Sequence, residues 1–133
     1  MSESPQQAIA RIRDTVQAAE NAGRLDLMRP FFADDLVILA PGFPPVIGAE
    51  AAASFMAGFF AQFDVEVSYV NAEIVVMGDW ALDRGSGRQT LRPKGGGPRV
   101  SENINYLWLY HCDPTGAWKH ARVTWNASSP ADS

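Results

Sequence analysis

Hydrophobic positions along the chain change their period near its middle. In the first half, apolar side chains recur every three or four residues, as they do on the buried face of an α-helix. In the second half they recur at every second residue, which is the period of a β-strand. Helices followed by an antiparallel meander predict an α+β fold, here in a single domain spanning residues 1–133.

The helical half opens with a typical helix start, Ser4-Pro5-Gln6-Gln7. Serine caps the first turn, proline suits the first helical position, and the second glutamine completes a capping box. These signals predict a helix over residues 5–22, followed by a short one that Pro30 kinks or cuts off. A further helix is predicted over residues 49–63, where Phe59 belongs to a broad apolar face that packs across the sheet.

Turn residues divide the second half into strands. Strands are predicted over residues 36–40, 65–77 and 80–92. A last hairpin spans residues 101–127. Its turn is Asp113-Pro114-Thr115-Gly116, with proline and glycine where a type I turn favours them.

The first strand of this hairpin is apolar on both faces. One face carries Ile104, Tyr106, Trp108 and Tyr110, and the other carries Asn103, Asn105, Leu107 and Leu109. Such a strand lies within a larger sheet that other elements cover. A buried amide costs roughly a few kcal/mol unless it finds a partner, so either a neighbouring side chain or a ligand satisfies Asn105.

Composition narrows the range of partners. The 133 residues are 47% apolar and 20% charged, and the formal net charge of -4 comes without a basic stripe. Nucleic acid and anionic membranes are therefore not expected as partners. The single cysteine, Cys112, fits a reducing compartment, and the polar MSESPQQ start lacks the plan of a signal peptide. The expected location is cytoplasmic.

Several segments follow one another in a recognisable order. They are ENAGRLD at the end of the first helix, PFFADDLVILAPG, IGAEAAASF at the start of the third helix, GDWALDRGSGRQTL and GAWKHARVTWNAS. Together they resemble the nuclear transport factor 2-like superfamily, which includes ketosteroid isomerases and SnoaL-like cyclases. The resemblance covers about residues 8–127, so the domain core is expected there, with short polar tails at both ends.

The resemblance implies a cone. N-terminal helices would pack on a strongly curved mixed, mainly antiparallel sheet and leave an internal, mostly apolar pocket for a small hydrophobic or aromatic molecule. It also implies a homodimer through the outer sheet face, which would carry Tyr106, Trp108 and Tyr110.

Ketosteroid isomerases use an aspartate base together with an oxyanion hole made of a tyrosine and a protonated aspartate. The resemblance places the base at Ala40, the acid of the oxyanion hole at Asn105 and the tyrosine at Val16. Ala40 and Val16 cannot perform these roles, and Asn105 can donate a hydrogen bond but cannot act as an acid. The chain is therefore not expected to be a ketosteroid isomerase, and Ala40 and Val16 are expected only as pocket wall.

The same correspondence predicts the rest of the pocket lining. It turns Asn105 inward, beside Asn103 and Leu107 and opposite Val123 and Trp125 of the last strand. Phe59 would complete the wall from the third helix.

Either of the two alternating sets of side chains on the strand over residues 80–92 could face the pocket. By position against the isomerases, Trp80 and Arg84 face the pocket, where Arg84 would offer a cation to a carboxylate or enolate-like ligand. The other phase turns Asp83 inward as a candidate general base. A shift of one residue in the alignment of this strand exchanges its inward and outward faces, so the sequence does not choose between the two. The plain alternative for both residues is a solvated charge on the sheet surface or a pairing with each other.

No metal site and no cofactor are predicted. His111 and His120 flank the last turn together with Cys112 and Asp113, but their spacing matches no zinc pattern. Strand alternation also sends His111 and Cys112 to opposite faces.

Three classes of function stay open, and one of them is partner-protein binding on the outer sheet face by a monomer that exposes Tyr106, Trp108 and Tyr110. The preferred hypothesis is a domain that binds a small hydrophobic or aromatic molecule. If it is an enzyme, it is a cofactor-independent isomerase, cyclase or dehydratase acting on a carbonyl compound. Asn105 and Arg84 would then stabilise negative charge, and Asp83 would be the base. The alternative is a non-catalytic ligand-binding or dimerisation module.

Overall fold

The structure is a computed structural model that describes residues 3–130, and the side chains of residues 3–128. The outer ends of the predicted polar tails, residues 1–2 and 131–133, lie outside the described residues. The elements are α1 (Pro5–Ala22), α2 (Leu25–Met28), the 3-10 helix η1 (Arg29–Phe31), β1 (Phe32–Leu39), β2 (Val46–Ile47), α3 (Ala49–Gln62), β3 (Phe63–Met77), β4 (Trp80–Pro93), β5 (Val100–Cys112) and β6 (Trp118–Pro130).

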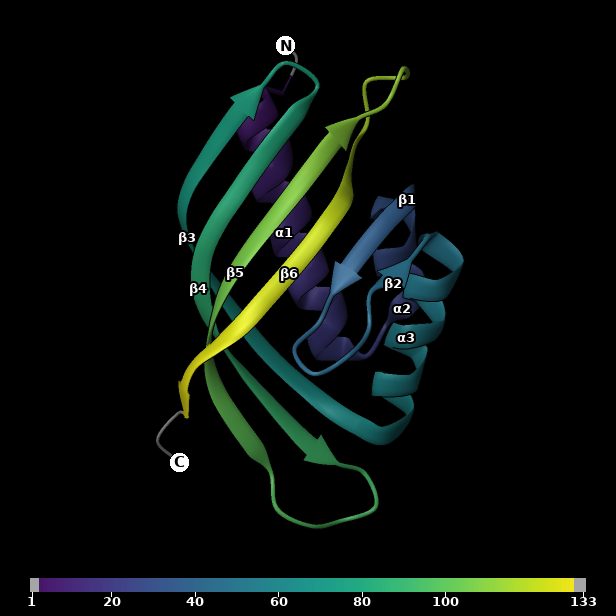
Figure 1. Cartoon of the computed structure of the whole chain (residues 1–133), viewed down its shortest axis with the longest axis vertical. Coiled ribbons are helices and arrows are strands. Elements are labelled where there is room, and N and C mark those ends of the chain that lie inside the picture. Colours follow the sequence, from purple (N-terminus) through teal and green to yellow (C-terminus); the bar gives the residue numbers. More distant parts are fainter. Residues whose placement is uncertain (1–2, 131–133) are drawn as a thin grey trace.

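The strands form one sheet in the order β2-β1-β6-β5-β4-β3. Every neighbouring pair is antiparallel except β1 and β6, which run parallel, so the predicted mixed, mainly antiparallel sheet is confirmed. The strands β3 to β6 are long and bent, α1 runs along one face of them, and α2 and α3 lie near β1 and β2 (Figure 1). This is the predicted α+β cone, an open sheet that curves around its helices.

Helix α1 begins and ends where the local signals predict. The Ser4 hydroxyl oxygen accepts the Gln7 N–H at 3.1 Å, and the Gln7 side chain accepts the Ser4 N–H at 2.9 Å, which completes the capping box. At the other end Gly23 adopts a left-handed φ of 65°, a conformation that glycine adopts at little cost. Within residues 3–130, no helix is long and apolar enough to cross a membrane.

The junction between the helices and the sheet differs from the prediction. The short helix is cut off, because Pro30 lies in η1 rather than in a continuous helix. Strand β1 then begins at Phe32, earlier than the predicted residues 36–40, because its first residues pair with β6 through an irregular register. Strand β2 was not predicted, since two residues carry no periodic signal.

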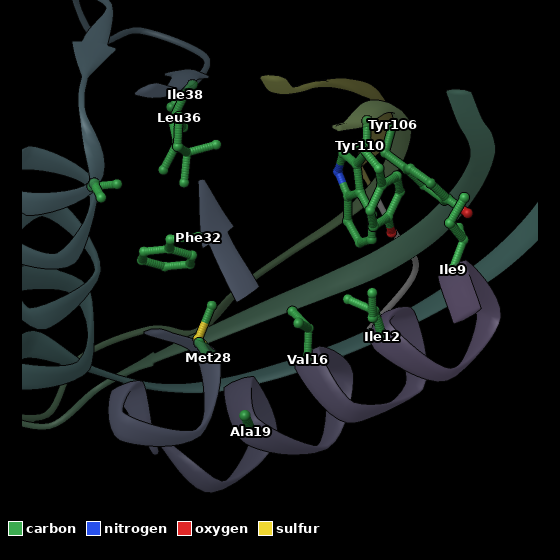
Figure 2. Close-up of a cluster of buried hydrophobic side chains, with 14 of the residues drawn as sticks. Ile9, Ile12, Val16, Ala19, Met28, Phe32, Leu36, Ile38, Tyr106 and Tyr110 are labelled. Atoms are coloured by element: carbon green, nitrogen blue, oxygen red, sulfur yellow. The ribbon is translucent and has the colours of Figure 1, made fainter. Parts of the chain in front are cut away.

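The hydrophobic core lies between α1 and the concave face of the sheet. Figure 2 shows Ile9 and Ile12 beside Tyr106 and Tyr110, and Val16 and Met28 near Phe32, Leu36 and Ile38. The apolar stripe of α1 therefore covers the aromatic side chains of β5 directly.

The aromatic side chains of β5 point into the cone. Tyr106, Trp108 and Tyr110 are 2%, 4% and 0% exposed, so the prediction that they form an outer dimer face is wrong. Both faces of this strand are apolar, so hydrophobicity alone did not choose between them. The correspondence with the isomerases was one residue out of phase, and such a slip reverses every side chain of a strand.

Candidate functional site: a cavity under the curved sheet

A cavity of about 80 Å³ opens between the helices and the concave face of the sheet. Its walls combine apolar and aromatic side chains with a few polar groups: Val16, Glu20, Met28, Phe32, Leu36, Ile38, Phe55, Met56, Phe59, Val65, Tyr69, Gln89, Leu91, Ile104, Tyr106, Trp108, His120, Val123 and Trp125. A volume of this size holds on the order of six water molecules, so a ligand of about one ring would fill it.

Part of the predicted lining is present in this cavity. Val16 lies on the wall because it belongs to the buried stripe of α1, and Phe59 lies there because α3 turns its aromatic face inward. Val123 and Trp125 also line the cavity, opposite Trp108 and Tyr106 in the register of β5 and β6.

Other predicted wall residues lie elsewhere. Ala40 is in the core just beyond β1, and Leu107 is 39% exposed on the outer face of the sheet. Asn103 shares that outer face, because it lies four residues before Leu107 on β5 and side chains alternate with a period of two. Trp80 also lies outside and stacks on His111, with ring centroids 4.5 Å apart. The one-residue slip explains Asn103, Leu107 and Trp80.

Asn105 and Arg84 were predicted to stabilise charge in the pocket, and both point away from it. Asn105 Nδ2 donates a hydrogen bond to Asn126 Oδ1 at 3.2 Å, so a neighbouring side chain satisfies this amide. Arg84 pairs with Glu73 on the outer face, where both side chains are about half exposed. Neither residue is available to a ligand in the cavity.

The side chain of Asp83 faces inward, which is one of the two orientations that the sequence left open. Its side chain is 0% exposed. Its oxygens accept hydrogen bonds from Asn71 Nδ2 at 2.6 Å, from the Tyr106 hydroxyl at 2.9 Å and from the Tyr110 hydroxyl at 3.3 Å. Arg13 of α1, itself buried, brings Nη1 to 3.6 Å from the same carboxylate.

This buried cluster holds the cone together rather than facing the cavity. Asp83 is not part of the cavity wall, and three donors already occupy its oxygens. Burial, together with the neighbouring Asp83 carboxylate, raises the pKa of Tyr106 above its ordinary value, so the phenol stays protonated and keeps donating. Asp83 thus positions Tyr106, which lines the cavity, and links β4 and β5 to α1 through Arg13.

The carboxyl group that does face the cavity belongs to Glu20, near the end of α1. The Tyr69 hydroxyl donates a hydrogen bond to Glu20 Oε1 at 2.6 Å. Glu20 is partly accessible, but it faces the cavity rather than open water. Burial raises the pKa of Glu20 to about 7, and the hydrogen bond from Tyr69 opposes part of that rise. No hydrogen bond within the described residues occupies Oε2.

Side chains of α1 fix this corner of the site against β3. Asn21 accepts the Val67 N–H at 2.7 Å and donates to the Val67 carbonyl oxygen at 3.1 Å, as a neighbouring strand would. Gln17 accepts the Tyr69 N–H at 2.9 Å. The Tyr69 ring packs edge-on against Trp108 with a centroid distance of 4.7 Å. These contacts to the backbone of β3 and to the Tyr69 ring hold the Tyr69 hydroxyl toward Glu20.

Glu20 was not predicted as a site residue, although a signal for it was present. Glu20 follows Val16, an expected residue of the pocket wall, by one helical turn and therefore lies on the same face of the helix. A carboxylate on the apolar stripe of a helix that covers a pocket is unusual enough to single out.

His111 and His120 separate to opposite faces of the sheet. His111 stacks on Trp80 outside, whereas His120 is 4% exposed and lies on the cavity wall. Among residues 3–130, no group of three His, Cys, Asp or Glu side chains is arranged to hold a metal ion.

Comparisons with known proteins agree with this architecture. A family model described as a SnoaL-like domain matches residues 12–121. A ketosteroid isomerase-like protein from Erwinia carotovora atroseptica superimposes with a TM-score of 0.84 at 25% identity, over 92% of this chain and 95% of that one. A nuclear transport factor 2-like superfamily protein from Salmonella enterica serovar Typhimurium gives 0.82 at 16% identity, over 96% and 92%.

A third solved structure, hexachlorocyclohexane dehydrochlorinase from Novosphingobium barchaimii, gives a TM-score of 0.82 at 15% identity, over 95% of this chain and 88% of that one. Similarity at this level of identity describes the fold. A search of curated proteins finds no match at a significant level. The chain has the fold of the nuclear transport factor 2-like protein. The family model spans most of the chain, and the chain therefore belongs to the SnoaL-like family.

Proposed function

We propose that the cavity binds a small, mostly apolar carbonyl compound and that Glu20 moves a proton on it without a cofactor. One observation carries this proposal: a carboxyl group with a free oxygen lies on the wall of an otherwise apolar cavity. A general acid or base works best when its pKa lies near the working pH, and the Glu20 pKa of about 7 meets that condition.

The chemistry follows from the position of the carboxylate. Glu20 removes a proton from the carbon next to the carbonyl group. The electron pair of that C–H bond forms a C=C bond, and the carbonyl π electrons move to oxygen, which gives an enolate. Returning the proton to another carbon completes an isomerisation. Delivering it to a departing hydroxyl group releases water and completes a dehydration. The Tyr69 hydroxyl keeps Glu20 oriented through both steps.

The walls favour a planar ligand. Trp108, Trp125 and Tyr106 offer aromatic faces, and Phe59 closes the cavity from α3. Aromatic faces stack on flat rings and exclude water, which strengthens the polar contacts of Glu20 inside the cavity. A single-ring ketone or enone therefore fits both the volume and the lining.

Proton exchange tests this function without knowledge of the natural substrate. Incubated in heavy water with cyclohexanone, the unmodified protein should speed deuterium uptake at the carbons next to the carbonyl, and the rate should rise as pH increases through about 7. Glu20→Gln should lose about a hundredfold or more of this acceleration, because positioned acid–base groups contribute that much. Glu73→Gln, on the outer face, is the matched control. Equal rates for the Glu20→Gln and unmodified proteins would contradict the assignment.

The second candidate is a non-catalytic ligand-binding module. Ring ketones that stabilise the protein against heat, combined with no deuterium uptake, would favour it over the enzyme. The few polar groups on the cavity wall could orient a ligand as well as react with it.

We also propose that the chain forms a homodimer through the outer face of its sheet. That face exposes Leu107, Val70 and Val75 at 39%, 65% and 41%. Arg84 and Glu73 provide paired charges beside them. Exposed apolar side chains gathered on one sheet face, with polar groups around them, are typical of a protein interface.

The expected location remains the cytoplasm. Cys112 is the single cysteine of the sequence, and a chain without disulfide pairs suits a reducing compartment.

A further inference from the structure

A β-bulge turns one side chain of β6 into the cone. In the pairing of β5 with β6, Tyr110 lies opposite His120. Its neighbour Leu109 lies opposite Arg122 rather than opposite Ala121. Ala121 is therefore an extra residue on β6. Strict alternation would place His120 and Val123 on opposite faces, but the bulge puts both on the cavity wall. Bulges recur next to functional sites, where they redirect a side chain.

The redirected imidazole has an unmet hydrogen bond. His120 is 4% exposed and packs against the Tyr110 and Trp108 rings at centroid distances of 4.7 and 5.2 Å. Its Nε2 is buried and makes no hydrogen bond with the described residues. Arg13 Nη1 is also without a hydrogen bond, but it has the Asp83 carboxylate as an ionic partner, whereas Nε2 has none. Leaving a buried polar atom unsatisfied destabilises a fold, so such atoms call for an explanation.

We propose that His120 donates a hydrogen bond from Nε2–H to the carbonyl oxygen of the ligand, while Glu20 acts on the neighbouring carbon. This inference rests on the proposed function of the cavity and adds the residue that recognises and polarises the carbonyl group. The two side chains come from different elements, Glu20 from α1 and His120 from β6, and both line the cavity.

A neutral imidazole is suited to this role. Burial lowers the pKa of His120 to about 4, so the ring carries no charge at neutral pH. As Glu20 takes the proton, the carbonyl π electrons move to oxygen, and the N–H of His120 bonds to the developing negative charge. The imidazole keeps its own proton, and all transfer occurs through Glu20.

Two ligands of the same shape test the contact. Cyclohexanone and methylenecyclohexane differ only in C=O against C=CH2. His120→Phe keeps a ring and removes the nitrogen, so it should bind methylenecyclohexane as the unmodified protein does and cyclohexanone about three- to tenfold more weakly. His120→Gln restores a donor and should recover part of the loss. Equal weakening of both ligands, or of neither, would overturn the proposal.

A spectroscopic readout on the unmodified protein does not depend on any variant folding. The chain has two histidines, so long-range proton–nitrogen NMR spectra contain two imidazoles, and His111 on the outer face serves as an internal reference. At pH 7 we expect the Nε2–H form of His120, with an Nε2 shift that responds to cyclohexanone and not to methylenecyclohexane. The Nδ1–H form, or no response, would overturn the proposal.

These outcomes separate the two proposals. If neither ligand binds the unmodified protein, the function of the cavity fails and the role of His120 fails with it. If cyclohexanone binds and Glu20→Gln abolishes deuterium exchange, but His120→Phe has no selective effect, the function stands and the role of His120 alone is wrong.

Discussion

A carboxylate changes its chemistry when it moves from water to an apolar wall. Glu20 has a partner in the Tyr69 hydroxyl, yet loss of water outweighs that bond and raises the Glu20 pKa to about 7. His120, on the same wall, is shifted the other way, with a pKa of about 4. Two groups whose surroundings drive them toward their neutral forms are typical of sites that handle protons.

The Glu20 shift predicts how stability depends on pH. The folded protein holds the Glu20 proton more tightly than the unfolded chain, whose carboxyl keeps the ordinary value of 4.5, so the free energy of unfolding should fall as pH rises from 4.5 to about 7. Glu20→Gln removes this term while keeping an acceptor for Tyr69. The variant should gain up to about 3 kcal/mol relative to the unmodified protein across that range.

Urea unfolding at a series of pH values measures this difference. The Tyr69 hydroxyl and the imidazole of His120 share the cavity with Glu20, but both are present in the two proteins, so their contributions cancel. Parallel curves for the two proteins would show that Glu20 has an ordinary pKa.

Asp83 and Glu73 provide a contrast between buried and exposed carboxylates. Asp83→Asn should lower the free energy of unfolding by about 3 to 5 kcal/mol, because it leaves the buried Arg13 without an ionic partner. Glu73→Gln breaks an exposed pair with Arg84 and should cost less than about 1 kcal/mol. Chemical denaturation of both variants tests this. Similar losses from the two substitutions would show that the Asp83 cluster does not stabilise the cone.

At the scale of elements, irregular points in the strands decide which side chains meet. The register of β3 on β4 shifts between Asn71 and Glu73, and Asn71 thereby reaches Asp83. The bulge at Ala121 turns His120 of β6 toward the cavity. Strict alternation would place His120 on the face opposite to Val123. The inward position of His120 therefore depends on a departure from regular strand geometry.

Glycine on β4 makes room for the aromatic side chains. A Cβ atom at Gly85 would lie 2.1 Å from the Val70 carbonyl oxygen and 2.7 Å from the Tyr106 ring. Gly85→Ala should therefore destabilise the protein by about 3 kcal/mol, because backbone atoms cannot move aside easily and Tyr106 would lose its place beside Asp83. Gly95→Ala, in the loop after β4, meets nothing within 4 Å and serves as the control. Thermal unfolding of the two variants measures the difference, and equal midpoints would contradict the expected clash.

At the scale of the whole molecule, the curved sheet has two faces of different character. The concave face holds the cavity and the aromatic side chains, and the convex face exposes aliphatic ones such as Leu107. The proposed ligand and the proposed dimer partner would not compete for the same surface, because the two faces of the sheet carry different side chains.

The proposed homodimer predicts a sensitive position. Leu107→Lys should raise the dimer dissociation constant about tenfold or more, since a charge in the interface loses water without gaining a partner. Leu27→Lys changes an equally exposed leucine, at 45%, on α2 and should leave association unchanged. Sedimentation velocity at several concentrations measures both. An unmodified protein that stays monomeric throughout would overturn the dimer.

Local patterns along the chain were sufficient to predict the class of fold and most element boundaries. The capping box of α1, its glycine C-cap and the turn at Asp113–Gly116 are local signals, and a few neighbouring residues contain all the information they need. The change from helical to strand period likewise predicts an α+β domain, because burial of one face is a property of each element separately.

Most residues of the site could be identified only once the chain was folded. Both faces of β5 are apolar, so the choice between Tyr106 and Asn105 depended on what the sheet curves around. The bulge that turns His120 inward leaves no periodic trace in the sequence. The pKa of Glu20 depends on burial by side chains from several elements and on the hydrogen bond from Tyr69 of β3. Helical spacing places Glu20 on the face of Val16, but contacts between distant segments set its pKa.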